Sequence, residues 1–494
     1  ALAWAAFSGV RRRGPNKAVG ISMTIGVILI LALGAVYSER KNIISTAVES
    51  RFAPAIGLVE TYQLKQASPP SNLARIVKFV LRVENGDTIP LYEVDVTADF
   101  PYQHDGSSHG ELPFTIDRNS GEPMNIIIIF MEGISARVLA SHGGPYTDLA
   151  PNLDRFAESS IVIDGYFNHT AASYRGIQGG LASAFPYAGG IGAWDLADNG
   201  GLVARSTTYA TLPKIFGNLG YDTRFFSPLG RSDPFHGFLE HLGFAEVNTF
   251  EDVPKYEPIS EALVDKDFFA SMVDAMQERE QSGDDSPFFW SAYNWGSHAF
   301  LDSPADATKY GDGSNAALNR FLELDTSIEI FIEAFEASSF ADNTILILTS
   351  DHSSYAEPPT VEAFAGSPNY TDNFIDEIPF MIRIPGVEQA ARYENGIRTS
   401  IDLAPTVLHL MGLSDVDHAF VGTSVFDPSV QPERNVAATG QDIYRIDSNG
   451  VTYITDETEI PEDEILIDTV YHYYQLEVEN RVFGDSQTAA EATD

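Results

Sequence analysis

The chain has 494 residues, of which 44% are hydrophobic and 20% charged, enough for one large domain or two to three ordinary ones. Its formal net charge of -40 argues against a nucleic-acid partner, although residues 1–80 carry ten Lys and Arg against three Asp and Glu. The absence of cysteine excludes disulfides, thiolate metal sites and a cysteine nucleophile.

The segment 18–37 is uncharged over twenty residues, which is long enough to cross a bilayer. It is longer than the apolar part of a signal peptide, and no clear small-x-small cleavage site follows it. We therefore predict a transmembrane helix over 18–37. By the positive-inside rule, the preceding RRRGPNK keeps residues 1–17 cytoplasmic; the end of an earlier span is an alternative for these residues. The protein would then lie in the cell membrane, with everything after residue 40 outside the cytoplasm.

Residues 38–120 predict an amphipathic juxtamembrane helix followed by a connecting arm with a few strands and several turn signals. From residue 121 to 430, buried β-branched runs alternate with amphipathic helices. This pattern predicts an α/β fold, a mostly parallel sheet with helices on both faces. The expected strands are 125–130, the end of 211–226, 287–295, 343–351 and 378–386, and the expected helices are 151–160, the start of 211–226, 317–338 and 400–412.

Residues 431–494 form an acidic C-terminal segment with two strand-like pieces, GVTYIT and YYQLEVENRVF. We expect these pieces to make a small antiparallel extension to the main domain.

Two of the predicted strands end in residues with metal-binding chemistry. The strand 125–130 leads to Glu132, and the strand 343–351 leads to Asp351 and His352. If both strands lie in one parallel sheet, these side chains emerge at the same edge, where α/β proteins bind ligands. Two carboxylates and an imidazole suit Mn²⁺, Mg²⁺ or Zn²⁺. Taken singly, Glu132 also fits a solvated turn residue and the SDHSS segment an Asx turn.

A candidate nucleophile stands in NHTAASYRG, residues 168–176. The glycines after Ser173 and the spacing of Ile177 and Leu181 predict the start of a helix, where free N–H groups favour an anion. A cation lowers the pKa of a hydroxyl that binds it, so Ser173 could serve as both ligand and nucleophile. Arg175 could clamp an oxygen of the substrate as a bidentate fork. From this segment alone, Ser173 fits a plain helix cap as well.

Several pieces in order over residues 120–430 resemble the alkaline phosphatase/sulfatase superfamily. Within it, the chain is similar to the membrane-anchored lipoteichoic acid synthase-like phosphoglycerol and phosphoethanolamine transferases. The pieces are NIIIIFMEG, APNLDRFAESSIVIDGYFNHTAASYRG, LPKIFGNLGYDTRFF, ILTSDHSS, and SIDLAPTVLHLMG with FVGTSVFD. The resemblance implies that residues 121–430 form a sulfatase-like catalytic domain. It also implies a membrane lipid or envelope glycan as the substrate.

The resemblance assigns roles to individual residues. Glu132, Asp351 and His352 would hold one divalent metal ion, with Mn²⁺ the first candidate and Zn²⁺ or Mg²⁺ as alternatives. Ser173 would be metal ligand and nucleophile. His298, in NWGSHAF, would contact the substrate or its leaving group, and Arg231, in PLGRSDPF, would grip the substrate phosphate.

The chain departs from the family pattern at three points. The transferases usually have threonine as nucleophile, so Thr170 is the alternative to Ser173. The proline of the sulfatase motif is missing after Ser173, which favours phosphoryl-type transfer over sulfate-ester hydrolysis. A histidine expected after the strand ending RFF is also missing, which leaves the substrate head group open.

These observations predict a membrane-anchored, metal-dependent enzyme that transfers a phosphoryl-linked group through a covalent serine intermediate. A sulfuric-ester or phosphoester hydrolase is the alternative within enzymes. A catalytically inactive binding module is the alternative from a different class.

Overall fold

The computed structural model describes residues 94–484, apart from the internal gaps at 96–97, 107–108, 117–122, 187–193, 197–201, 205–207, 260, 369, 371, 388–390, 441 and 456–459. The predicted span 18–37 and juxtamembrane helix lie outside these residues. Among the helices that the structure describes, none combines the length and apolar character needed to cross a membrane.

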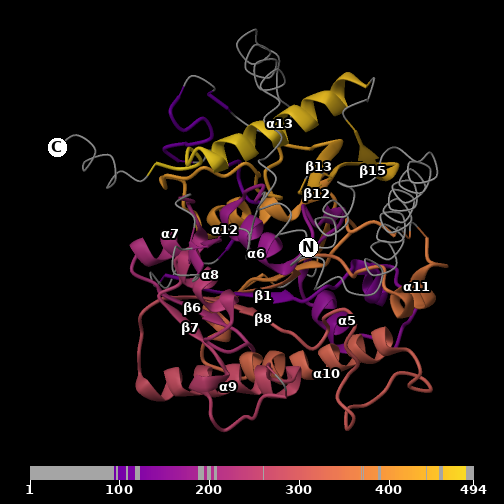
Figure 1. Ribbon diagram of the computed structural model, residues 1–494. Coiled ribbons are helices and arrows are strands. Elements are labelled where there is room, and N and C mark those ends of the chain that lie inside the picture. The colour runs from indigo at the N-terminus through magenta and orange to yellow at the C-terminus, as the bar shows by residue number, and fades with distance from the viewer. Residues whose placement is uncertain are drawn as a thin grey trace, which may run out of the picture. The chain divides into compact units, whose positions relative to one another are not determined.

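An eight-stranded sheet forms the centre of the described chain (Figure 1), in the strand order β11-β2-β10-β9-β1-β8-β6-β7. All pairs are parallel except the two made by β10, which confirms the predicted mostly parallel sheet. The strands are β1 (Asn125–Met131), β2 (Ile161–Ile163), β6 (Asp222–Phe226), β7 (Glu246–Asn248), β8 (Phe288–Tyr293), β9 (Thr344–Ser350), β10 (Phe380–Arg383) and β11 (Ala391–Tyr393).

Helices cover both faces of this sheet (Figure 1), as predicted. On one face lie α5 (Pro151–Glu158), α9 (Asp265–Ser282), α10 (Ala316–Glu336) and α11 (Pro358–Phe364). On the other lie α6 (Ser173–Ala182), α7 (Leu212–Asn218), α8 (Pro234–Leu242) and α12 (Leu403–Met411). Short 3-10 turns connect them at η1 (Ala136–Val138), η2 (Ala140–His142), η4 (Phe250–Asp252), η5 (Ala341–Asn343) and η6 (Ser400–Asp402).

The isoleucine run of β1 shows why this arrangement forms. Successive side chains of a strand point to opposite faces, so Ile126 and Ile128 enter one core while Ile127 and Ile129 enter the other. All four are fully buried. A strand that is apolar at every position is stable only between two layers of helices, which places β1 in the middle of the sheet.

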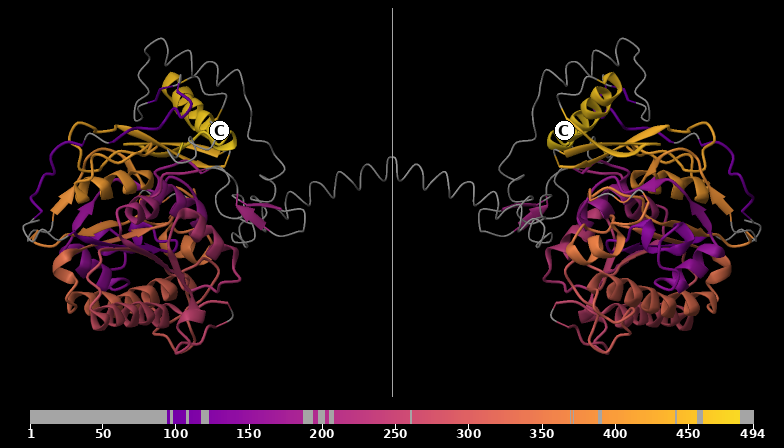
Figure 2. Two further views of the ribbon diagram at one scale, coloured as in Figure 1. Left: turned by 90° about the vertical axis from the view of Figure 1, so that its left-hand side faces the viewer. Right: turned by 90° about the vertical axis from the view of Figure 1, so that its right-hand side faces the viewer.

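The C-terminal segment packs on the side of α6 and α12 (Figure 2). It contains the antiparallel strands β13 (Arg434–Thr439), β14 (Asp442–Asp447) and β15 (Gly450–Ile454), followed by α13 (Pro461–Val478). The expected antiparallel extension is present, and GVTYIT forms β15. The strand expected for YYQLEVENRVF is wrong, because α13 runs through most of it and buries Tyr473 and Tyr474.

Smaller pairings complete the described chain. They join β3 (Tyr166–Phe167) to β12 (Arg398–Thr399) and β4 (Trp194–Leu196) to β5 (Leu202–Ala204). The connecting arm was expected to contain strands. Its described residues, from 94 to 116, form only the isolated bridge between His104 and His418, because this part packs irregularly against the main domain.

Candidate active site

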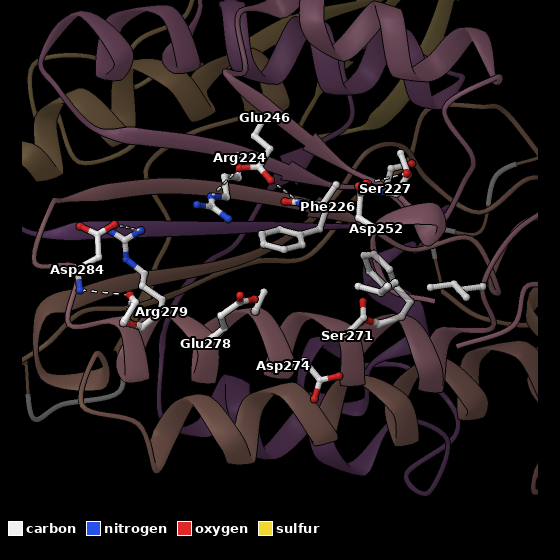
Figure 3. Close-up of a pocket in the computed structure, with 17 residues that line it drawn as sticks. Arg224, Phe226, Ser227, Glu246, Asp252, Ser271, Asp274, Glu278, Arg279 and Asp284 are labelled. Carbon is white, nitrogen blue, oxygen red and sulfur yellow. Dashed lines mark hydrogen bonds and ion pairs between the residues drawn. The ribbon is translucent and has the colours of Figure 1, made fainter. Parts of the chain in front are cut away.

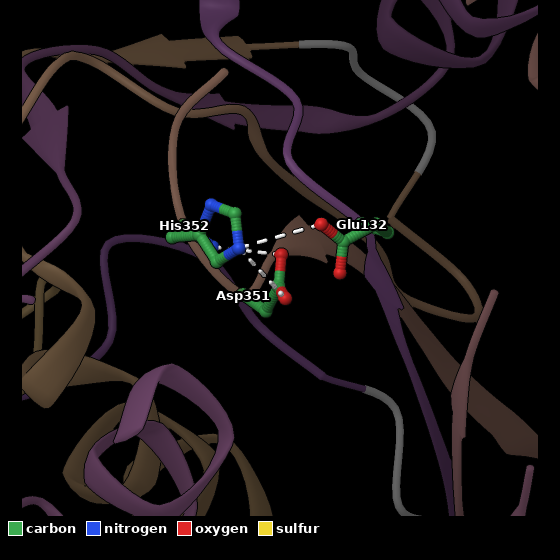
Figure 4. Close-up of side chains that lie close together, drawn as sticks. All are labelled: Glu132, Asp351 and His352. Carbon is green, nitrogen blue, oxygen red and sulfur yellow. Dashed lines mark hydrogen bonds and ion pairs between the residues drawn. The ribbon is translucent and has the colours of Figure 1, made fainter. Parts of the chain in front are cut away.

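The carboxyl ends of β1 and β9 bring two acidic side chains together. The strands pair in parallel with Met131 opposite Ser350, so Glu132 and Asp351 follow at neighbouring positions, and His352 comes next. The three side chains point toward one another (Figure 4), and one possible ligand atom from each lies within 4.8 Å of the others. The structure thus brings together the residues that the sequence analysis placed at one sheet edge.

The atoms at the centre of this cluster fit a divalent cation. Glu132 Oε1 and Asp351 Oδ2 are buried and have no hydrogen-bond partner among the described residues. His352 Nε2 lies 3.4 Å from the first oxygen and 3.5 Å from the second. His352 Nδ1 lies 2.8 Å from the Ser353 carbonyl, which only accepts, so Nδ1 carries a hydrogen and the neutral ring offers the Nε2 lone pair.

The electrostatics of the cluster call for a positive charge at the same point. Burial and the Glu132 carboxylate raise the pKa of Asp351 to about 7. Burial lowers the pKa of His352, but Asp351 and Glu132 outweigh it and raise that pKa to about 9. Burial raises the pKa of Glu132, whereas His352 and His298 lower it to well below its usual range. Two adjacent buried carboxylates need a proton or a metal ion between them.

Hydrogen bonds between the strand ends fix the loops that carry these ligands. Asp351 Oδ1 accepts from the Gly133 N–H at 2.9 Å. Ser350 Oγ accepts from the Ile134 N–H at 3.0 Å and donates to the Met131 carbonyl at 2.6 Å. Asp351 Oδ1 is therefore occupied by a hydrogen bond that fixes the loop, whereas Oδ2 faces the cluster without a hydrogen-bond partner among the described residues.

The end of β8 holds the main chain of Glu132. Asn294 Oδ1 accepts from the Glu132 N–H, and Ser297 Oγ donates to the Glu132 carbonyl, at 2.9 and 2.8 Å. Asn294 Nδ2 donates to Asp265 and to Ser297, both at 2.9 Å. Burial raises the pKa of Asp265 to about 6, against the lowering effect of its hydrogen bonds. The buried Asp265 thus orients the side-chain amide of Asn294, and Asn294 in turn orients Glu132.

Ser173 lies against the cluster at the first position of α6. Its hydroxyl donates to Glu132 Oε2 at 2.8 Å and lies 3.3 Å from the Tyr293 hydroxyl. Ala172, just before it, has φ +73° and ψ 135°, a conformation that costs a residue with a Cβ about 1–3 kcal/mol. The strained residue turns the chain sharply so that the serine hydroxyl faces the carboxylates.

A glycine lets α6 approach the Asp351 loop. A Cβ at Gly176 would stand 2.0 Å from the Asp351 carbonyl oxygen, so only glycine fits there without a shift of the backbone. On the same helix, Ile177 and Leu181 are fully buried, which confirms the predicted helix and its apolar face. The start of α6, which carries Ser173, and the loop that carries Asp351 are therefore in close backbone contact.

The two other candidates in this segment, Thr170 and Arg175, are both buried. Thr170 is buried, and its hydroxyl has no hydrogen-bond partner among the described residues. Arg175 is buried as well, and its Nε donates to the Ala171 carbonyl at 2.9 Å, which holds the turn before Ser173. Ser173, not Thr170, is the hydroxyl bonded to Glu132. The clamping role of Arg175 stays a prediction.

His298 and Arg231 differ in their surroundings. His298 is buried, its ring centroid is 4.2 Å from that of Trp295, and its Nδ1 lies 2.9 Å from the Ala299 carbonyl. It is close enough to the cluster to contribute to the lowered pKa of Glu132. The Arg231 side chain is 55% exposed and pairs with Asp252 of η4. These contacts give no support to the predicted phosphate-binding role of Arg231.

Sequence reasoning missed Tyr293, Asn294 and Asp265. A signal for the first two was available, because AYNW places polar groups at the end of the strand that neighbours β1. Asp265 begins α9, far along the chain from its partners, and carries no local signal.

Comparison with known proteins agrees with this geometry. Residues 124–413, more than half of the chain, match the Sulfatase family. The chain belongs to the Sulfatase family. This family lies in the alkaline phosphatase superfamily, and the matched range spans β1 to the end of α12, with every residue of the cluster inside it.

Curated relatives include lipoteichoic acid synthases. Lipoteichoic acid synthase 1 of Bacillus subtilis is 22% identical over 338 residues, which cover 65% of this chain and 50% of the relative. Lipoteichoic acid synthase of Staphylococcus aureus is 24% identical over 254 residues, covering 46% of this chain and 37% of the relative. The chain thus spans about half the length of the curated relatives it matches.

Solved structures share the fold. A crystal structure of an alkaline phosphatase superfamily protein from Vibrio parahaemolyticus gives a TM-score of 0.62 at 16% identity, covering 84% of this chain and 98% of that one. Lipoteichoic acid synthase LtaP from Listeria monocytogenes gives 0.56 at 16% identity, covering 74% and 96%. At this level of identity the likeness establishes the fold.

Proposed function

We propose that the protein is a metal-dependent transferase that moves a phosphoryl-linked group, of the phosphoglycerol or phosphoethanolamine type, through a covalent bond to Ser173. The observation that carries the proposal is the 2.8 Å hydrogen bond from Ser173 Oγ to Glu132, beside two buried, unpaired carboxylate oxygens. Kinship with lipoteichoic acid synthases favours a phosphoglycerol-type group over the sulfate alternative. The missing proline after Ser173 points the same way.

Glu132, Asp351, His352 and Ser173 would hold the ion, for which we propose Mn²⁺ ahead of Zn²⁺ and Mg²⁺. When bound, a divalent ion neutralises developing charge and favours the ionised hydroxyl. The remaining chemistry belongs to the side chains. Before the reaction the Ser173 hydroxyl donates to Glu132 Oε2, and its proton would pass to solvent when the hydroxyl ionises.

In the first half-reaction, Ser173 Oγ attacks phosphorus and forms a new P–O bond, while the P–O bond to the lipid alcohol breaks. The leaving oxygen needs a proton, which His298 can supply from Nε2. His298 Nδ1 faces a carbonyl acceptor and therefore keeps its hydrogen. For Nε2 to supply a proton as well, both ring nitrogens must be protonated.

In the second half-reaction, an acceptor hydroxyl attacks the phosphoserine and gives its proton to His298. The P–O bond to Ser173 breaks, and the serine oxygen leaves as the alkoxide with which the cycle began. A glycan or lipid hydroxyl makes the enzyme a transferase, whereas water would make it a phosphoester hydrolase. We propose a membrane lipid as the donor, presented to a catalytic domain over residues 121–430. Residues 18–37 would anchor this domain on the outer side of the cell membrane, with 431–494 as its extension.

Labelling of the full chain in detergent tests the proposal. The full chain with Mn²⁺ is incubated with phosphatidylglycerol or phosphatidylethanolamine carrying ³²P in the head group. We expect label on Ser173, lost in Ser173→Ala and retained in Thr170→Ala. Unlabelled protein together with steady release of sulfate from aryl sulfates would refute the transferase in favour of a sulfuric-ester hydrolase.

A further inference from the structure

Tyr293 places a hydroxyl between the nucleophile and the first carboxylate. It is the last residue of β8, and it pairs with Phe130 of β1. Its side chain is buried, and its hydroxyl donates to Glu132 Oε2 while lying 3.3 Å from Ser173 Oγ. The Tyr293 hydroxyl is the donor in the bond to Glu132, because a carboxylate oxygen accepts.

The two oxygens of Glu132 have different environments. Oε1 has no hydrogen-bond partner among the described residues and faces His352 Nε2. Oε2 accepts from two hydroxyls, those of Ser173 and Tyr293. Oε1 is therefore available to a metal ion, whereas Oε2 is turned toward Ser173.

One of these two donors disappears during the reaction that we propose. Once Ser173 Oγ is bonded to phosphorus it has no hydrogen to donate, so Glu132 Oε2 loses that bond. The main chain of Glu132 stays fixed by Asn294 and Ser297, but the carboxylate could rotate about its terminal torsion. The Tyr293 hydroxyl remains as the donor that prevents this rotation.

We propose that Tyr293 is a positioning residue that keeps Glu132 Oε1 on the metal ion while Ser173 carries the phosphoryl-linked group. The inference rests on the proposed function and assigns it a residue that acts through Glu132. It gives a role to the buried hydroxyl of a tyrosine that stands at the end of β8.

Phenylalanine provides a clean test. The Tyr293 ring packs on Phe235 with centroids 5.3 Å apart, and Tyr293→Phe retains this ring while removing the hydroxyl. Tyr473→Phe is the matched control, because Tyr473 is equally buried and packs on Tyr102 and Phe185 in the C-terminal segment. Thermal unfolding of the metal-free full chains checks that both variants fold.

Mn²⁺ affinity, measured by titration calorimetry, supplies a readout apart from activity. We expect Tyr293→Phe to weaken Mn²⁺ binding about 10-fold. The loss of Mn²⁺ affinity caused by Tyr293→Phe should be larger in a Ser173→Ala background, where Tyr293 is the donor left on Glu132 Oε2. Tyr473→Phe should leave the Mn²⁺ affinity unchanged in both backgrounds. Steady-state kinetics should show a lower kcat with KM for the lipid unchanged.

A failure of the proposed function and a failure of the Tyr293 proposal give different results in these measurements. If the wild-type chain binds no Mn²⁺, the proposed function fails and the Tyr293 proposal falls with it. If the wild type binds Mn²⁺ normally and Tyr293→Phe matches it in both backgrounds, the Tyr293 proposal alone is overturned.

Discussion

The strand-end cluster and the groove beside α9 are two opposite kinds of polar site. The groove, about 520 Å³, lies between α9 and the strands β6 and β7 (Figure 3). Its arginines are already paired, Arg224 with Asp222 and Glu246, and Arg279 with Asp222 and Asp284. The strand-end cluster is much smaller, yet its carboxylates keep unpaired oxygens. Unsatisfied buried charge marks a site for chemistry better than open volume does.

The sharpest test of this contrast removes one group from each region. Ser173→Ala and Asp351→Asn should each lower kcat at least about 10³-fold, because one removes the proposed nucleophile and the other a proposed metal ligand. Glu278→Gln in the groove should leave kcat within about two-fold of wild type, since an exposed charge contributes little. Head-group transfer is measured for the three variants and for the wild type. A large loss for Glu278→Gln would mean that the groove takes part.

The backbone contact between α6 and the ligand loop gives the next largest effect. Gly176→Ala should lower the free energy of unfolding by about 3 kcal/mol and weaken Mn²⁺ binding, because the new Cβ would collide with the Asp351 carbonyl. Gly217→Ala, in α7, meets only Thr223 Cγ2 at 3.9 Å and should stabilise the protein by about 0.5–1 kcal/mol. Urea unfolding measures both. Equal effects of the two substitutions would contradict the close approach.

A substitution of Asp325 tests whether burial alone gives a carboxylate a role in metal binding. It caps α5 by accepting from the N–H groups of Asn152 and Leu153, and burial raises its pKa to about 7. The unfolded carboxyl ionises near pH 4, so folding takes up a proton between about pH 4 and 7, and stability falls as pH rises through this window. Relative to Asp325→Asn, the wild type should lose about 4 kcal/mol of stability across this window.

Denaturant unfolding at several pH values measures the Asp325 effect. Mn²⁺ affinity should be the same in Asp325→Asn and in wild type, because both carboxylate oxygens of Asp325 accept backbone donors. A drop in Mn²⁺ affinity would contradict this expectation. It would show that a buried carboxylate whose oxygens already accept hydrogen bonds still affects metal binding at the strand-end cluster.

The smallest effect concerns the strained turn before the nucleophile. Ala172→Gly should raise the free energy of unfolding by about 0.5–1 kcal/mol, since glycine adopts a positive φ without the cost that a Cβ brings. Ala171→Gly, at a buried neighbour, should lower it by a similar amount. Calorimetric unfolding of the two variants gives opposite signs if the turn stores strain, and the same sign if it does not.

The predictable part of the site is the part encoded in local sequence. β1 and β9 are long apolar runs, so their place in the sheet, and with it the meeting of Glu132 and Asp351, followed from pattern alone. The reversed direction of β10 has no such signature, because an apolar run reads the same in both directions.

The parts that could not be predicted depend on long-range packing. Asn294 meets Asp265 and Glu132 only after three separate segments have folded together. α13 contains Tyr and Val residues that favour strands, but burial of its aromatic side chains against the main domain overrides that local preference. The phosphate-binding role of Arg231 stays a prediction from the family resemblance, and the ion pair of Arg231 with Asp252 is a contact that local sequence did not indicate.

The hydrogen bonds around Glu132 also bear on how quickly the proposed ion would be taken up. Asn294, Ser297 and Tyr293 fix the main chain and one carboxylate oxygen of this residue, so uptake would require little rearrangement of the protein. The loss of water from the ion would then be the slow step. Mg²⁺ gives up its water reluctantly. Exposed to a mixture of ions, newly folded chains would therefore fill first with the ion that dehydrates faster, and kinetics would select the metal before equilibrium does.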